Sequence, residues 1–322
     1  MDFNWKIIGN NRAVEFLDKS LASKNIANFY IFSGLSGTGK FTLAKNFISN
    51  IFFQDQPDLR PKENFLETNS DFFVVEREED KKDISIDQIR GLIERFKTSS
   101  FLNSYRTAII KNAENLNENS ANALLKVLEE TNDKTVIIIT VDDVDKLPKT
   151  IISRSQIVNL FPVKFDLIYK HLIDEFKVGP SLAKELARIS SGCPAVAIKF
   201  IENEELYNNY KAIVYDFIDF LKSNFLDRTK IIDNVIKKNE FFSNSEILTI
   251  WQSVLRDLIF IHLGHYDYIK NIFALENLES FRNDNLDLKK IREDSIVLNQ
   301  GLRRLALNIN IRNTLEYIAV NI

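Results

Sequence analysis

A lysine that follows regularly spaced glycines is the first feature of this sequence that could do chemistry. Residues 34–40 read GLSGTGK, and Gly34, Gly39 and Lys40 match the G-x-x-x-x-G-K part of a phosphate-binding loop. In such a loop the backbone N–H groups surround the phosphates of a nucleotide, and the lysine neutralises part of their charge. The stretch therefore predicts a site for a phosphate-bearing ligand.

The hydroxyl group that such a loop needs directly after its lysine is missing. A Ser or Thr at this point holds Mg²⁺, and here the position is occupied by Phe41. Thr42 comes one residue too late, because one helical step turns a side chain by about 100° and would direct this hydroxyl away from the metal. We therefore predict a degenerate nucleotide site without a metal. Its candidate residues are Gly34, Gly37, Gly39, Lys40 and Thr42.

The segments around the loop have the order that a phosphate loop requires. Residues 28–34 (NFYIFSG) form a short apolar run rich in aromatic residues, which is typical of a strand. The following residues, FTLAKNFISNIFF, place Leu43, Phe47 and Ile51 at helical spacing. The order strand, loop, helix favours a phosphate loop over a chance glycine-rich turn.

A second strand lacks the acidic residues that would complete an ATPase site. In such a site an Asp at the end of an apolar strand helps to hold Mg²⁺, and an adjacent carboxylate can orient the attacking water. The candidate strand ends AIIKNAENL, with Lys111 and Asn112 at these two positions. Glu114 follows both, and we expect it at the start of a helix, where the dipole favours a carboxylate. Because both contributions to metal binding are missing, we do not expect this chain to hydrolyse ATP.

The composition restricts the classes of protein to which the chain can belong. A net charge of −3 over 322 residues argues against binding nucleic acid alone through a broad basic face, so we expect any DNA contact to be shared with partners. The single cysteine, Cys193, can form neither an internal disulfide nor a multi-cysteine zinc site, which suits a reducing compartment. The start of the chain has no basic segment followed by an apolar core, and no run approaches the ~18 apolar residues of a membrane span. We expect a cytoplasmic protein.

Strand-like and helical segments alternate only in the first half of the chain, which predicts a parallel sheet covered by helices. Beyond about Phe165 the pattern is helical throughout. One example is the predicted apolar face of Leu206, Tyr210, Ile213, Phe217 and Phe220, which we interpret as core. The predicted strands cover residues 29–34, 71–76, 106–113 and 135–141.

Three neighbouring segments resemble the core of the bacterial DNA polymerase III clamp-loader subunits, which are AAA+ proteins. They read NENSANALLKVLEE (117–130), TVIIIT (135–140) and KLPKTIISRSQIV (146–158). The family pattern has an Asn-Ala-Leu-Leu-Lys-x-Leu-Glu-Glu helix, then a strand with a polar sensor, then a Ser-Arg-Cys turn. Weaker matches, such as IIGNNRAVEFL near the start and WQSVLRDLIF at 251–260, extend the resemblance over nearly the whole chain.

The resemblance implies an architecture of three parts, α/β followed by all-α. It predicts an AAA+ nucleotide-binding-like domain with a P-loop-type parallel sheet (1–163), a small helical lid domain (164–203) and a C-terminal helical collar domain that oligomerises (204–322). Many family members bind zinc through four cysteines in a region that corresponds to residues 51–73. That region has no cysteine here, so we expect no zinc in that form. His262 and His265 could share a helical face, and we interpret them as ordinary amphipathic positions.

The same resemblance assigns a role to Arg154. Ser153 and Arg154 match the family turn, and Ser155 stands where the family has Cys. The resemblance implies that Arg154, with Ser153, acts in trans as an arginine finger on the transferred phosphoryl group in a neighbouring subunit. Taken alone, an arginine at this point would be interpreted as capping the preceding helix. In the lid stretch SGCPAVAIKF, Ala195 stands where active relatives carry a sensor arginine.

With a defective nucleotide site and a retained arginine, the chain resembles the stator of the clamp-loader ring. The stator is a largely rigid subunit that does not hydrolyse ATP. It would support ATP-driven loading of the sliding clamp on primed DNA. The implied partners are the gamma/tau and delta subunits, with the clamp and the DNA contacted through the complex, and no membrane. No cofactor is required, and passive binding of ATP or ADP stays open. Two alternatives remain, an active gamma/tau-type ATPase and a stand-alone regulatory or DNA-binding module.

Overall fold

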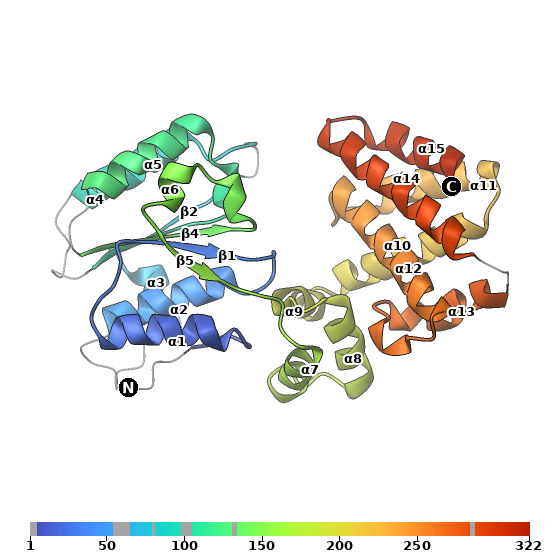
Figure 1. The fold of residues 1–322 in the computed structure, drawn as a ribbon, viewed down its shortest axis with the longest axis horizontal. Coiled ribbons are helices and arrows are strands. Elements are labelled where there is room, and N and C mark those ends of the chain that lie inside the picture. Colours follow the sequence, from blue (N-terminus) through green and yellow to red (C-terminus); the bar gives the residue numbers. More distant parts are fainter. Residues whose placement is uncertain (1–4, 54–64, 79–80, 98–104, 131–133, 284–286) are drawn as a thin grey trace. The chain divides into compact units, whose positions relative to one another are not determined.

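The computed structural model of the chain describes residues 5–53, 65–78, 81–97, 105–130, 134–283 and 287–322 (Figure 1). It divides into two compact units. The first comprises Met1–Ile168 with Gly192–Ala195, and the second comprises Tyr169–Ser191 with Val196–Ile322. The division into three domains at 163 and 203 stays a prediction.

The first unit contains a five-stranded parallel sheet in the order β2-β3-β4-β1-β5. Four strands lie within the predicted ranges, and the fifth was not predicted from the sequence. In chain order, the elements of this unit are α1 (Asn11–Ala22), β1 (Phe29–Ser33), α2 (Lys40–Phe52), α3 (Phe65–Thr68), β2 (Phe72–Val75), α4 (Ile86–Lys97), β3 (Arg106–Ile110), η1 (Ala113–Asn115), α5 (Glu118–Glu130), β4 (Thr135–Val141), η2 (Val144–Lys146), α6 (Lys149–Ile152) and β5 (Gln156–Asn159).

The three inner strands are buried along their whole length, as parallel strands covered on both faces must be. This explains why β1 and β4 read as nearly continuous apolar runs, whereas β3 begins with the buried polar residues Arg106 and Thr107. The edge strand β5 reads QIVN; its two end residues are exposed, and the two apolar residues between them are more buried. It is short and half polar, so its sequence lacks the signal of the inner strands, and its pairing with β1 (Tyr30 opposite Gln156) becomes visible only in the fold.

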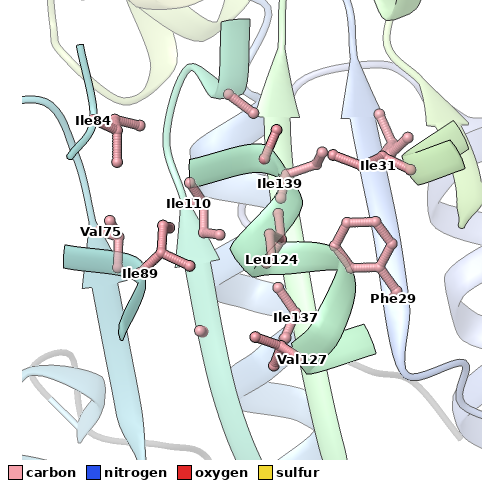
Figure 2. Packing of buried hydrophobic residues seen from close by; sticks show 14 of the residues in the cluster. Phe29, Ile31, Val75, Ile84, Ile89, Ile110, Leu124, Val127, Ile137 and Ile139 are labelled. Atoms are coloured by element: carbon pink, nitrogen blue, oxygen red, sulfur yellow. The ribbon is translucent and has the colours of Figure 1, made fainter. Parts of the chain in front are cut away.

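Helices cover both faces of the sheet (Figure 1). α4 and α5 lie on one face, and α1, α2 and α3 lie on the other. Figure 2 shows the core on the side of α4 and α5, where Ile89, Leu124 and Val127 from the helices meet Ile110 and Ile137 from the strands. Burial of these aliphatic side chains stabilises the layers by about 25 cal/mol per Å² of apolar surface removed from water.

The second unit is helical, as the sequence predicts beyond Phe165. α12 packs against α10, α13 and α14, while α15 packs against α11 and α14. Its elements are α7 (Phe165–Asp174), α8 (Pro180–Ile189), α9 (Pro194–Glu202), α10 (Glu204–Lys222), α11 (Phe225–Lys238), α12 (Asn244–His262), η3 (Tyr266–Tyr268), η4 (Ile272–Ala274), α13 (Leu275–Asn283), α14 (Leu288–Ala306) and α15 (Ile311–Asn321); the first residues of α7 and α9 are counted with the first unit.

Aromatic side chains form the centre of this helical unit. Phe217 stacks on Trp251 with ring centroids 4.6 Å apart, and Phe220 lies 5.2 Å from the same indole. The predicted apolar face of α10 is therefore core at these positions and at Tyr210 and Ile213, whereas Leu206 is only half-buried. None of the described helices is long and apolar enough to cross a membrane.

One carboxylate is completely buried in the helical unit. Asp257 on α12 accepts hydrogen bonds from the backbone N–H groups of Lys270 and Asn271 and from the Asn271 amide, each at 2.8 Å. Tyr210 donates its hydroxyl to Asn271 Oδ1 at 2.7 Å. Burial raises the pKa of Asp257, and the hydrogen bonds from residues 270 and 271 oppose that shift.

Candidate functional site: a phosphate loop with internal partners

The predicted phosphate loop connects β1 to α2 at the carboxyl end of the sheet. Gly39, with φ of 96°, precedes the first residue of α2. A Cβ atom on Gly34 would lie 2.2 Å from the carbonyl oxygen of Leu160, so only glycine fits there. The fold thus places this backbone at the N-terminus of a helix, where anions bind in proteins that use such loops.

Lys40 is held by two acceptors of the chain itself. Its side chain is only 7% exposed, and its Nζ donates to Asp142 Oδ1 at 2.7 Å and to the carbonyl oxygen of Gly34. Asp142 directly follows β4, the strand that pairs with β1, and this adjacency brings the carboxylate to the loop. The charge that a phosphate would neutralise is therefore already paired.

Phe41 and Lys111, the two residues at the positions where the sequence predicts missing metal ligands, lie against each other. Phe41 is the second residue of α2 and packs against the core on the side of α1 to α3. The Lys111 ammonium lies over its ring, 4.8 Å from the centroid. Lys111 also forms an ion pair with Glu76, which directly follows β2.

The other expected acidic positions have different environments. Asn112 adopts a left-handed backbone with φ of 52°, and its N–H donates to Thr140 Oγ1 at 3.0 Å. Glu114 lies in the first turn of η1, a helix of only three residues, which agrees with the expected position near a helix start. Its Oε2 is buried and has no hydrogen-bond partner among the described residues.

These residues do not fit a magnesium nucleotide. Position 41 offers an aromatic ring and position 111 a cation, whereas Mg²⁺ takes oxygen ligands. The residues that the structure describes include no group of three or more His, Cys, Asp or Glu that could hold a metal ion. Residues 54–64, which are part of the region where relatives bind zinc, lie outside the described part of the chain.

The Gly192–Ala195 segment lies at the phosphate loop. Ala195 donates its N–H to the carbonyl oxygen of Gly37 at 3.1 Å, and Gly192 accepts from the Val163 N–H at 2.8 Å. The backbone of Ala195 is therefore joined directly to the loop. A methyl group supplies no charge there. Thr42, by contrast, is exposed on α2.

Arg154 lies apart from these residues, on an exposed turn between α6 and β5. Its guanidinium donates to the carbonyl oxygen of Thr150 at 3.2 Å, and the Ser153 hydroxyl donates to the same oxygen at 3.2 Å. Both side chains thus interact with the end of their own short helix. Arg154 as a whole is exposed to solvent.

Sequence reasoning missed Asp142. The stretch VDDVDK has three acidic residues after β4, and nothing in their spacing distinguishes Asp142 from Asp143. The distinguishing signal would have been the order of the strands. A residue that directly follows the strand beside β1 must lie close to the loop that also follows β1.

The sheet order, the loop after β1 and the helices that follow define a P-loop α/β protein of the AAA+ type. Residues 9–164 match the family described as DNA polymerase III, delta subunit. A solved structure with the same fold is a DNA polymerase III gamma subunit-related protein from Thermotoga maritima, with a TM-score of 0.51 and 17% identity over 94% of this chain and 97% of that one.

Curated relatives extend the similarity to the second unit. The delta′ subunit of DNA polymerase III from Bacillus subtilis is 23% identical over 99% of this chain and 98% of its own length. The delta′ subunit from Pseudomonas aeruginosa is 32% identical over 40% of this chain and 41% of its own. The resemblance to the bacterial DNA polymerase III clamp-loader subunits is confirmed, and it covers nearly the whole chain.

Proposed function

We propose that this chain acts as a delta′-type subunit of a bacterial DNA polymerase III clamp loader. The observation that carries this proposal is the end-to-end match to a delta′ subunit in a chain whose phosphate loop has lost its metal positions. In this role the chain supports ATP-driven loading of a sliding clamp on primed DNA.

The chain would take part in this work without hydrolysing ATP. The ring of Phe41 replaces a hydroxyl ligand, and the Lys111 ammonium repels Mg²⁺ from the position of the acidic ligand. A single substitution of this kind could be compensated by other ligands, but these two affect both halves of the metal site. No cofactor is required for this role, and ATP or ADP held passively would not contradict it.

Arg154 would supply the chain's contribution to catalysis. It lies on an exposed turn, a position from which an arginine side chain can reach a neighbouring subunit. There it would stabilise the charge on the phosphoryl group during transfer, a contribution worth roughly 10³ to 10⁵ in rate in proteins that use such a residue. Ser153 shares the Thr150 carbonyl with it and would position the turn.

The proposed partners are gamma/tau and delta subunits in the cytoplasm, with the helical second unit providing the assembly surface. The test is reconstitution with the gamma/tau and delta subunits of the same organism. We expect a stable complex whose clamp-dependent and DNA-dependent ATPase requires this chain. A stable monomer without affinity for those subunits would identify a stand-alone module. Steady Mg²⁺-dependent hydrolysis by the isolated chain that disappears in Lys40→Ala would identify an active gamma/tau-type ATPase.

A further inference from the structure

The phosphate loop contains an anion of the chain itself beside its lysine. The Lys40 side chain is 7% exposed, and its ammonium interacts with the Asp142 carboxylate at 2.7 Å and with the Gly34 carbonyl. A phosphate group in this loop would need the same ammonium. It would also meet the negative charge of Asp142 at close range; this side chain is 37% exposed, so water screens part of the repulsion but does not remove it.

The geometry points to Asp142 as a built-in counter-ion that excludes phosphate groups from the loop. This inference rests on the proposed absence of ATP hydrolysis and goes beyond it, because it assigns the exclusion to one carboxylate. The missing metal ligands alone would weaken only the binding of nucleotides that carry magnesium. Asp142 also acts against free pyrophosphate and against ATP without a metal, since these need only the lysine and the backbone cradle.

The strands explain why this pair is held together. Asp142 directly follows β4, Gly34 directly follows β1, and Ser33 lies opposite Val141 in the β1–β4 pairing. The Gly34 N–H donates to the carbonyl oxygen of Val141 at 3.2 Å, so the backbone fixes the loop beside the carboxylate. Removing the charge of Asp142 leaves the Lys40 ammonium largely buried without its anionic partner, which creates an affinity for anions.

The chain offers a matched control for a substitution of Asp142. Asp143 is the next residue and is exposed, and its carboxylate accepts a hydrogen bond from the Asp145 N–H at the start of η2. Asp143→Asn therefore removes the same charge from the same segment without touching Lys40. Asparagine is also a good capping residue, so the fold of η2 is kept.

The experiment measures binding of pyrophosphate, and of ATP in the presence of a chelator, by calorimetry. We expect Asp142→Asn to bind pyrophosphate at least about tenfold more tightly than the wild-type and Asp143→Asn chains. The gain should be lost in the double variant Lys40→Met/Asp142→Asn. A folded Asp142→Asn chain with no gain, or a gain that persists without Lys40, would overturn the inference while leaving the proposed clamp-loader role intact.

A second measurement needs no substitution. In the wild-type chain, the amide resonances of Gly37 and Gly39 should stay unchanged when pyrophosphate is added, because the loop does not bind it. Saturable shifts of these two resonances would overturn the inference even if Asp142→Asn failed to fold. Hydrolysis of magnesium ATP by the wild-type chain is a separate outcome, and it would contradict the proposed function itself.

Discussion

The Lys111 ammonium lies over the ring of Phe41, 4.8 Å from its centroid. Each residue occupies a position where an ATPase of this type has a ligand for Mg²⁺, and here the two contact each other. A cation over an aromatic ring contributes about 0.5–2 kcal/mol, depending on how far it is removed from water. The two residues therefore form one stabilising contact, as expected if the proposed absence of a metal site is correct.

Restoring one ligand should not restore the site. We expect Phe41→Thr to remain without ATP hydrolysis, because the Lys111 ammonium still occupies the region of the metal. The variant should also lose about 1–3 kcal/mol of unfolding free energy, since the ring packs against the core. Urea unfolding and a steady-state ATPase assay measure these effects. Thr42→Ala on the exposed face of α2 is the control and should change neither quantity.

Arg154 should affect catalysis without affecting stability. In a reconstituted complex where only this chain is altered, we expect Arg154→Ala to slow ATP hydrolysis by up to about 10³-fold while the complex still assembles. Arg154→Lys should rescue little, because an ammonium does not reproduce the planar fork. The exposed Lys149→Ala on the preceding helix serves as the control. A wild-type rate for Arg154→Ala would leave the chain with a purely structural role.

The buried Asp257 should be essential for the helical unit. Asp257→Ala leaves the N–H groups of Lys270 and Asn271 without their acceptor inside the protein. We expect a loss of about 3–5 kcal/mol in unfolding free energy, measured by chemical denaturation. Asp219→Ala, at an exposed position of α10, should stay within about 0.5 kcal/mol of wild type. Similar stabilities for the two variants would contradict the importance of this network.

Asp216 should make stability depend on pH. Burial raises its pKa above the ordinary value of 3.8, Lys238 lowers it, and Asp219 raises it further. The folded chain therefore keeps this proton to higher pH than the unfolded chain does. The stabilising contribution is complete below pH 3.8 and is lost as the pH rises through the raised pKa.

Replacing this carboxylate should thus stabilise the chain at neutral pH. We expect Asp216→Asn to be slightly more stable than wild type at pH 7, and the difference to vanish as the pH falls below the ordinary aspartate value. Urea unfolding over a series of pH values measures it. Asp174→Asn, at an exposed position of α7, should show no comparable gain. A difference that grows toward acid pH would show the opposite sign of the linkage.

Much of the α/β unit could be predicted from local pattern. The inner strands are apolar because both faces of the sheet are covered, and Gly34 to Lys40 have a spacing that few other structures require. The strand β5 was missed because an edge strand of four residues with polar positions has no such pattern.

The contacts within the site were less accessible to sequence reasoning. Phe41 and Lys111 were each recognised as departures, but their mutual contact depends on how α2 packs beside the end of β3. The pairing of Lys40 with Asp142 depends on β4 lying next to β1. These two residues are about a hundred positions apart in the chain. Local periodicity contains no information on strand order, so neither contact could be derived from it.

The pairing of β1 with β5 has a consequence for the whole assembly. Gly34 directly follows β1, and Arg154 lies two residues before Gln156, the first residue of β5. The loop and the arginine are thus attached to opposite ends of one ladder of backbone hydrogen bonds. Since Asp142 keeps the loop in one state, we expect the position of this arginine to be independent of the ratio of ATP to ADP in the cell. Changes in that ratio would then act on the assembly only through its other subunits.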